Sequence, residues 1–213
     1  EKFFEWAKPQ ISEAQPDALS GLVFWVYNHY MITKDKVFLE KSWDSVKKAM
    51  ALIEKQTSIK SGLVIPVFWE EKLGIGYHSV AGIYSAFNLG SKIARALGNE
   101  HYANAWDGTA EKIRESRKSC SHETFHASYR DRDVEASLLS LAIPFGMVEP
   151  WDEKMRKTVE KIVSVFWPGP LTLVLKKKSV IPDIVTAGLD TVAVRLPGHW
   201  IARALIRSSG RPV

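Results

Sequence analysis

Residues 68–98 of the chain read FWEEKLGIGYHSVAGIYSAFNLGSKIARALG. The part from Ser79 to Leu97 predicts a helix, and Gly98 can close it because glycine readily adopts the left-handed conformation that follows a helix C-terminus. The part before this helix belongs to a segment, 61–76, that is rich in glycine, proline and aromatic residues. This segment is too apolar for a solvated linker, so we expect it to carry structure or chemistry.

Helical patterns flank this run on both sides. Between Asp35 and Lys55 apolar residues recur at alternating steps of four and three, which places them on one helix face: Leu39, Trp43, Val46, Met50 and Ile53. Asp35 can cap the start of that helix. Further helices are expected over 18–30, after Asn99, over 134–141 and over 152–163. Short connections and the lack of a strand pattern predict an all-α array for residues 1–163.

The last part of the chain, 164–213, differs in both pattern and charge. It holds seven Lys and Arg against two Asp, and so accounts for the whole formal net charge of +5. A short apolar run predicts a strand at 171–175, alternation predicts another at 191–196, and a short helix follows at 201–207. The expected fold is therefore mainly α: about six helices over 1–163, then a strand–strand–helix unit over 164–213. A charged terminal hairpin on a single domain is the alternative.

Composition excludes several classes of protein. The chain has 213 residues, of which 46% are apolar and 25% charged, a normal globular balance. No apolar run approaches the roughly 20 residues of a membrane span. The single cysteine, Cys120, rules out an internal disulfide. The chain begins at Glu1 without a secretory leader, so we expect a cytoplasmic protein that has been processed or cut from something longer.

Two adjacent carboxylates, Glu70 and Glu71, follow Trp69 in the central segment. A carboxyl group beside an aromatic wall loses hydration of its charged form, which raises its pKa and suits it to general acid catalysis. Glycosidases use such an acid to protonate the departing sugar oxygen. The structural alternative is a helix N-terminus with two acidic residues and Trp69 in the core.

The whole stretch 68–98 resembles the glucoamylase-like glycoside hydrolases, whose acid lies in a Trp-Glu-Glu motif before a long helix. Two further stretches resemble the same family in the same order: QPDALSGLVFWVYNHYMITKDKVFLEKSWDSVKKAM at 15–50 and DVEASLLSLAIPFGMVEPWDEKMRKTVEKI at 133–162. The resemblance covers about residues 8–163. It implies part of an α/α toroid that cleaves α-linked glucans or maltooligosaccharides with inversion and needs no cofactor.

By this resemblance Glu70 is the general acid, Glu71 a substrate contact and Trp69 a subsite wall, while Asp17 is a weaker substrate-binding candidate. An inverting enzyme also needs a second carboxylate as base. In this family the base comes from later in the barrel than the region of resemblance. We therefore expect little or no hydrolysis from this chain.

The tail FWPGPLTLVLKKKSVIPDIVTAGLDTVAVRLPGHWIARALIRSSGRPV, 166–213, closely resembles threonylcarbamoyl-AMP synthases in the middle of their sequence. That family joins L-threonine, bicarbonate and ATP into an adenylate used in tRNA modification. The resemblance places Thr172 and Arg195 near the nucleotide, and a guanidinium suits phosphate oxygens. The family's N-terminal basic segment and its later Ser-Ala-Asn stretch are not found, so we expect no catalysis by this part alone.

One other motif is present. His122, Glu123 and His126 match the H-E-x-x-H pattern of zinc peptidases, with Glu135, Glu149 or Glu153 as a possible third ligand. The segment is not amphipathic, so we expect no metal site.

Two enzyme-like parts in one chain suggest a chimera or fusion. A hydrolase leads the functional hypotheses, ahead of a synthase and a non-catalytic hybrid. We also expect self-association or a loosened state that binds dyes, because half a helical ring leaves apolar faces uncovered.

Overall fold

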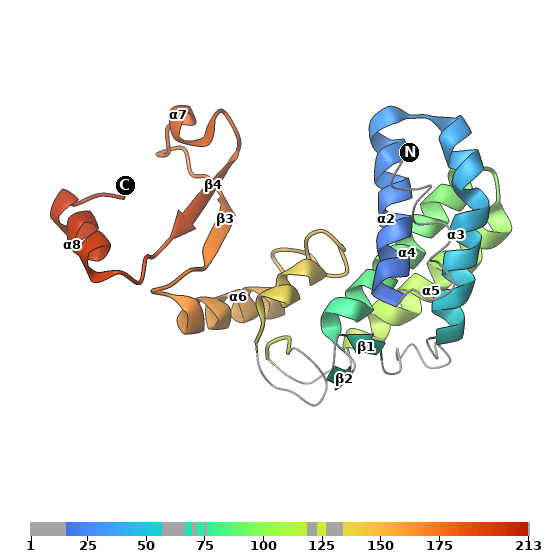
Figure 1. Ribbon diagram of the computed structural model, residues 1–213, viewed down its shortest axis with the longest axis horizontal. Coiled ribbons are helices and arrows are strands. Elements are labelled where there is room, and N and C mark those ends of the chain that lie inside the picture. Colours follow the sequence, from blue (N-terminus) through green and yellow to red (C-terminus); the bar gives the residue numbers. More distant parts are fainter. Residues whose placement is uncertain are drawn as a thin grey trace. The chain divides into compact units, whose positions relative to one another are not determined.

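The computed structural model describes residues 16–56, 67–69, 72–74, 76–118, 123–126 and 134–212. The chain divides into two compact units, Glu1–Thr158 and Val159–Val213, and the described part is mainly helical (Figure 1). No helix in this described part combines the length and the apolar character that crossing a membrane requires.

The first unit is built around one central helix. Helix α4 (Tyr77–Ala96) lies against α2 (Pro16–Thr33) and α5 (Glu100–Lys118), while α3 (Lys36–Gln56) lies mainly against α2 (Figure 1). Fifteen of the twenty residues of α4 are buried. The helix predicted from Ser79 to Leu97 is therefore the core of the unit, and its neighbours cover it on several sides.

Helix α3 confirms the periodic pattern in the sequence. Leu39, Val46 and Ile53 are fully buried, as the spacing of four and three predicts. The Oδ1 of Asp35 accepts a hydrogen bond from the backbone N–H of Phe38 at 2.9 Å, so Asp35 caps the helix.

Glycine allows α4 to approach its neighbours closely. A Cβ on Gly90 would lie 3.2 Å from Cε3 of Trp106 and 3.4 Å from the side chain of Met50. At the end of α4, Gly98 has a φ of 75°, which confirms its predicted role in closing the helix.

Two segments of the first unit differ from the prediction. Strands β1 (Val67–Trp69) and β2 (Lys72–Gly74) form an antiparallel pair, although no strand was expected before residue 164. Strands of three residues are too short to show a two-residue alternation. The segment predicted as a helix over 134–141 is a 3₁₀ helix, η2 (Ala136–Leu141). Its period of three brings Leu138 and Leu141 to one buried face.

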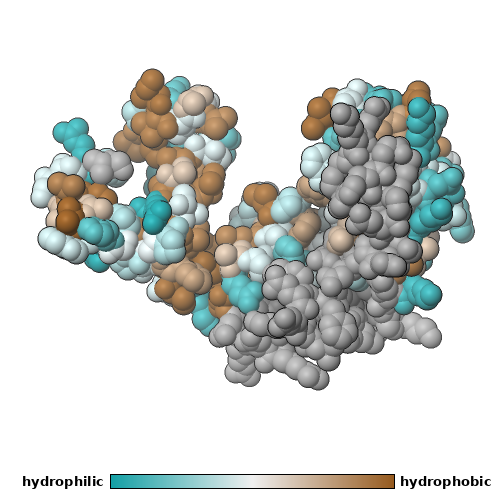
Figure 2. Space-filling view, viewed as in Figure 1, coloured by the Kyte–Doolittle hydropathy of each residue, from teal (hydrophilic) through white to brown (hydrophobic). Residues whose placement is uncertain are grey.

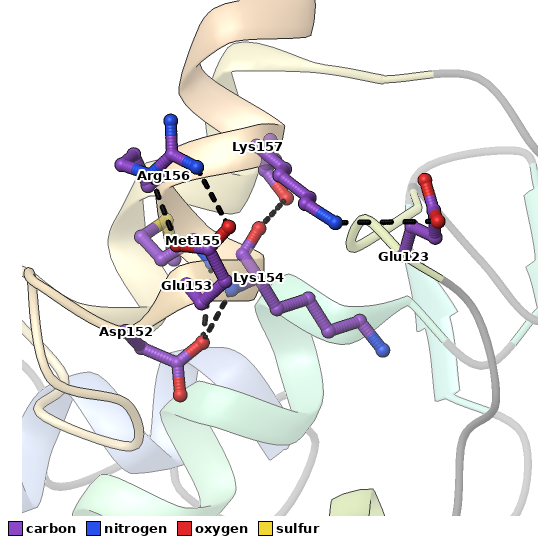
Figure 3. A network of polar contacts seen from close by, with 8 residues as sticks. Glu123, Asp152, Glu153, Lys154, Met155, Arg156 and Lys157 are labelled. Carbon is purple, nitrogen blue, oxygen red and sulfur yellow. Dashed lines mark hydrogen bonds and ion pairs between the residues drawn. The ribbon is translucent and has the colours of Figure 1, made fainter.

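Helix α6 (Glu153–Phe166) spans the boundary between the two units. The Oδ1 of Asp152 accepts hydrogen bonds from the N–H groups of Lys154 and Met155, at 2.9 and 3.2 Å (Figure 3). Asp152 is therefore the cap of a helix that was predicted to end at residue 163 and continues to Phe166. The domain boundary predicted at 163/164 lies within this helix.

The second unit contains the predicted strand–strand–helix pattern. Strands β3 (Thr172–Lys176) and β4 (Thr191–Arg195) are antiparallel, with Thr172 opposite Arg195 and Lys176 opposite Thr191. Helix α8 (Trp200–Ser209) follows, and a short helix, α7 (Asp183–Thr186), lies between the strands in the sequence.

Candidate functional site

Three of the first group of candidate residues belong to the segment of β1 and β2, which precedes α4 in the sequence: Trp69, Glu70 and Glu71. Trp69 ends β1 and is paired with Lys72 of β2. Glu70 and Glu71, which come between these partners in the sequence, lie outside the described residues. Their roles therefore stay predictions.

Asp17 belongs to the first turn of α2. The early turns of α2 and α4 lie side by side, because a Cβ on Gly82 would be 3.7 Å from the Cβ of Ser20. The start of the helix that carries Asp17 is thus next to the start of the helix that follows the β1–β2 pair. Segments about sixty residues apart in sequence meet at this end of the helices.

A buried phenylalanine joins the start of α4 to α6. Phe125 is 2% exposed, and the edge of its ring meets Tyr77 at a centroid distance of 5.7 Å. The Nζ of Lys154 lies 4.8 Å from the centroid of the same ring. The N–H of Phe125 donates to Oγ1 of Thr158 at 2.9 Å. These contacts hold the first turns of α4 and α6 in one place.

A polar cluster lies next to this joint. The Nδ1 of His78 is 2.7 Å from Oγ of Ser140, and the Ser140 hydroxyl donates to the carbonyl oxygen of Ser137 at 2.5 Å. A hydroxyl has one proton to donate, so Ser140 accepts from His78, and His78 carries a proton on Nδ1. The ring of Phe145 packs against His78 at 5.4 Å. The cluster fixes the orientation of an imidazole near the start of α4.

The residues of the H-E-x-x-H motif do not form a helix where they are described. Residues 123–126 are irregular, His126 is 9% exposed, and His122 lies outside the described residues. The carboxylate of Glu123 is exposed and lies 4.0 Å from Nζ of Lys157 (Figure 3). Within the described ranges no three His, Cys, Asp or Glu residues gather as metal ligands. This segment packs on α6 through Phe125.

The second group of candidates lies on the β3–β4 pair. Thr172 and Arg195 are cross-strand partners, so the structure places both on the same exposed face. The Nε of Arg195 donates to the carbonyl oxygen of Gly169 at 3.0 Å. This bond holds the base of the guanidinium and sets the direction of its two terminal amino groups.

The turn that receives Arg195 is itself closely held. The N–H of Gly169 donates to the carbonyl of Leu196 at 2.8 Å, and Nε1 of Trp167 donates to the carbonyl of Leu171 at 2.7 Å. A Cβ on Gly169 would collide with the carbonyl oxygen of Phe166. Only glycine fits this turn, which brings the chain back beside the end of β4.

The side chain of Lys177 holds the loop between β3 and β4. Nζ of Lys177 pairs with the carboxylate of Asp183 and lies 3.5 Å from Oγ1 of Thr186. The Thr186 hydroxyl is 2.8 Å from the carbonyl of Leu189, and the chain turns at Ala187 and Gly188, whose φ angles are 51° and 81°. The contacts of Lys177 and Thr186 therefore hold the segment that leads into β4.

Sequence spacing missed the His78–Ser140 pair, because 62 residues separate them. It also missed the packing role of Phe125, because this residue lies within the H-E-x-x-H motif and was considered only as part of a zinc-binding pattern. The two candidates on β3 and β4 were placed in strands correctly, and only the pairing shows that they are opposite each other.

Comparison with known proteins finds two families. The model described as glycosyl hydrolases family 15 matches residues 5–169, and the Sua5/YciO/YrdC model, described as telomere recombination, matches residues 127–213. The two matches overlap over 127–169. The resemblances stated from the sequence are thus confirmed for both parts of the chain.

Individual relatives agree with this division. An uncharacterized glycosyl hydrolase of Methanocaldococcus jannaschii is 24% identical over 174 residues, 78% of this chain and 28% of that protein. The threonylcarbamoyl-AMP synthase of Pyrococcus abyssi is 43% identical over 84 residues, 39% of this chain and 25% of that protein. The synthase of Idiomarina loihiensis is 36% identical over 85 residues, 39% of this chain and 46% of that protein. The chain thus spans about a quarter of the length of the first two.

Proposed function

Because the chain belongs to glycosyl hydrolase family 15, we propose that its first part binds α-linked glucans and that Glu70 is the general acid of their hydrolysis. The family match over residues 5–169 carries this proposal, since it includes the Trp-Glu-Glu segment and the helix that follows. In this role the carboxyl group of Glu70 donates its proton to the glycosidic oxygen as the bond to the sugar breaks.

The neighbouring candidates take binding roles in the proposal. Trp69 provides an aromatic wall for a sugar ring, Glu71 contacts sugar hydroxyls, and Asp17 approaches from the start of α2. The adjacency of the first turns of α2 and α4 supports this grouping. Inversion also requires a carboxylate about 6.5–9.5 Å from the acid, to activate water. The resemblance assigns no residue of this chain to that role, so we expect glucan binding without appreciable glucose release.

A binding measurement can distinguish the proposed role of the acid, Glu70, from the roles of the neighbouring binding residues. We would titrate the 213-residue chain with maltotriose and with 1-deoxynojirimycin, a cationic glucose analogue, by calorimetry at pH 6. Glu70→Gln should weaken binding of the cationic analogue at least tenfold and affect maltotriose less, because a carboxyl group can give up its proton and pair with the ammonium group, whereas an amide of the same shape cannot. Glu111→Gln, at an exposed site on α5, should change neither.

Two results would contradict this function. One is a failure of the unaltered chain to bind either sugar. The other is equal affinity of the Glu70→Gln variant for the cationic analogue. Glucose release from maltotriose that persists in Glu70→Gln would separately refute the acid role.

We propose a second function for the tail, as part of a threonylcarbamoyl-AMP synthase that binds ATP as substrate. Arg195 supports it, because its guanidinium is braced through Nε on Gly169 and lies across from Thr172. The terminal amino groups of Arg195 would grip phosphate oxygens, and the Thr172 hydroxyl would add a hydrogen bond. L-Threonine, bicarbonate and tRNA are the further partners of this role, which would place the chain in the cytoplasm.

The nucleotide proposal is tested by binding of a fluorescent ATP analogue, and by pyrophosphate release that requires both threonine and bicarbonate. Arg195→Ala should lower nucleotide affinity at least tenfold, whereas Arg203→Ala on α8 should leave it within twofold. Equal loss in both variants would mean that general positive charge, and not this residue, holds the nucleotide.

We further propose that the chain by itself self-associates or binds hydrophobic dyes. Exposed apolar side chains in the second unit support this, among them Ile184 at 90% and Trp200 at 74%. Light scattering behind a sizing column tests it, and a sharp monomeric peak with no dye fluorescence would contradict it.

A further inference from the structure

An aromatic cluster connects α3 with α5 in the first unit. The rings of Trp43 and Tyr102 meet edge to face at a centroid distance of 5.5 Å, and the ring of Trp106 lies 5.7 Å from the first and 5.2 Å from the second. Trp106 is 4% exposed and packs beside Gly90 of α4, whereas Trp43 is half-buried and Tyr102 is 39% exposed. The cluster thus has a buried base and an outer surface that reaches solvent.

This surface is separate from the residues proposed for glucan hydrolysis. Gly90 comes thirteen residues after Tyr77, the first residue of α4, so the two lie about 20 Å apart along the helix. The first turns of α5 lie beside the end of α4, because Arg95 bonds to Asp107 at 2.7 Å. The Trp-Glu-Glu segment, in contrast, precedes the start of α4 in the sequence.

Charged and polar side chains surround the outer surface of the cluster. Figure 2 shows mainly hydrophilic side chains along α3, at the right of the view. The exposed neighbours on the two helices are Glu40, Lys41, Asp44, Lys48, Glu100, His101 and Asn104. The centre of a protein–protein interface is depleted of charged residues, so these surroundings fit a polar ligand better than a protein partner.

An ion pair lies at the edge of the cluster. The Nζ of Lys47 is 2.8 Å from Oδ1 of Asp44 and 5.7 Å from the centroid of the Trp43 ring. Their hydrogen bond raises the pKa of Lys47 and lowers that of Asp44, so both are charged at neutral pH. A carboxylate accepts hydrogen bonds and an ammonium group donates them. The pair can therefore accept from one hydroxyl group of a ligand and donate to the next.

A sugar ring has the chemistry that this surface recognises. The faces of a pyranose ring carry C–H groups that pack on an aromatic ring, and its edge carries adjacent hydroxyls that both donate and accept. Tyr102 is held by Trp43, Trp106 and His101, whose ring centroid is 5.8 Å away. Because these neighbours already fix its ring, Tyr102 loses little freedom when a ligand packs on it.

We propose that Tyr102, Trp43, Asp44 and Lys47 form a second glucan-binding site on the α3–α5 side of the first unit. The proposal rests on the proposed glucan-binding function for the identity of the sugar. A long glucan can engage both sites of one chain, which raises its overall affinity through effective concentration, whereas maltotriose is too short to do so.

The test is co-sedimentation of the 213-residue chain with glycogen. Tyr102→Ala should raise the dissociation constant for glycogen fivefold or more, and Asp44→Asn should raise it about threefold, because each removes one of the two kinds of contact. Both variants should bind 1-deoxynojirimycin within twofold of the unaltered chain. Trp151→Ala, which removes a 79% exposed aromatic ring outside the cluster, should leave the affinity for glycogen within twofold.

Three outcomes would overturn the second site. They are failure of the unaltered chain to bind glycogen, unchanged affinity in both Tyr102→Ala and Asp44→Asn, and an equal loss in Trp151→Ala. Circular dichroism checks that Tyr102→Ala folds, and Asp44→Asn provides the answer if it does not, since the side chain of Asp44 is 82% exposed.

The failure of this site and the failure of the proposed function give different results. Glycogen binding that depends on Tyr102, in a chain that does not bind 1-deoxynojirimycin, would support the second site and count against the role of Glu70. Binding of 1-deoxynojirimycin that depends on Glu70, with glycogen affinity independent of Tyr102 and Asp44, would leave the proposed function in place and refute the second site.

Discussion

Phe125 illustrates how much one side chain contributes to the first unit. Its ring meets Tyr77 of α4, and Lys154 of α6 lies over it. We expect Phe125→Ala to lower the free energy of unfolding by about 3–5 kcal/mol, because it leaves a cavity where two elements meet. Urea denaturation measures this. Trp151→Ala, at a site that is 79% exposed, should change stability by less than about 0.5 kcal/mol.

The His78–Ser140 hydrogen bond makes a chemical prediction. Because Ser140 gives its proton to Ser137, His78 should carry its proton on Nδ1 in the neutral form. Nitrogen-15 shifts of the imidazole at pH 8 report this directly. Ser140→Ala should return the ring to the Nε2–H form and cost about 1 kcal/mol of stability. An Nε2–H tautomer in the unaltered protein would refute the hydrogen-bond assignment.

An ion pair between α4 and α5 gives a pH dependence. Burial raises the pKa of Asp107, but its polar and charged neighbours, chief among them Arg95 with its hydrogen bond to the carboxylate, outweigh that effect, so the pKa falls below its ordinary 3.8. The folded state therefore binds fewer protons than the unfolded state, and the pair stabilises it above that pH. The stabilisation is lost as the pH falls below 3.8 and through the lowered pKa of the folded protein.

Asp107→Asn measures this contribution. Since the carboxylate is 44% exposed, we expect a loss of only about 0.2–1 kcal/mol at pH 7. The difference from the unaltered protein should shrink as the pH falls below 3.8. A difference that grows in acid would show that the sign is wrong.

Among the elements, local periodicity predicted long helices well and short segments poorly. The spacing along α3 identified its buried face, and Asp35 identified its start. The β1–β2 pair was not predicted, and η2 was predicted as a helix but not as a 3₁₀ helix, because strands of three residues and a single 3₁₀ segment contain too few repeats. The candidate site was likewise predicted only as the Trp-Glu-Glu sequence motif. The contacts of His78 and Phe125 join distant segments and have no periodic signal.

Close packing between α4 and its neighbours depends on Gly90. A Cβ at position 90 would lie 3.2 Å from the ring of Trp106, and a larger side chain would have to displace that ring. We expect Gly90→Val to cost about 1–3 kcal/mol by overpacking. Gly108→Ala on α5 meets nothing within 4 Å and should instead stabilise the helix by about 0.5–1 kcal/mol. Thermal unfolding of both variants tests this, and equal effects would contradict it.

At the scale of the whole molecule, the two parts differ in how they are stabilised. The first unit buries a continuous set of apolar side chains around α4, whereas the second, over 159–212, buries two large ones, Ile162 and Leu173, and exposes twelve. The change in charge and in residue pattern along the sequence predicted two parts. It did not predict that α6 continues across the boundary between the two units. A helical pattern in the sequence does not indicate at which residue the contacts of one unit end.

Hydrogen exchange along the full chain tests most directly whether one unit has a core and the other lacks it. The amides of α3 and α4 should exchange only on global unfolding, and those of β3, β4 and α8 much faster, by local opening of the second unit. Protection of β3 and β4 equal to that of α4 would contradict the account.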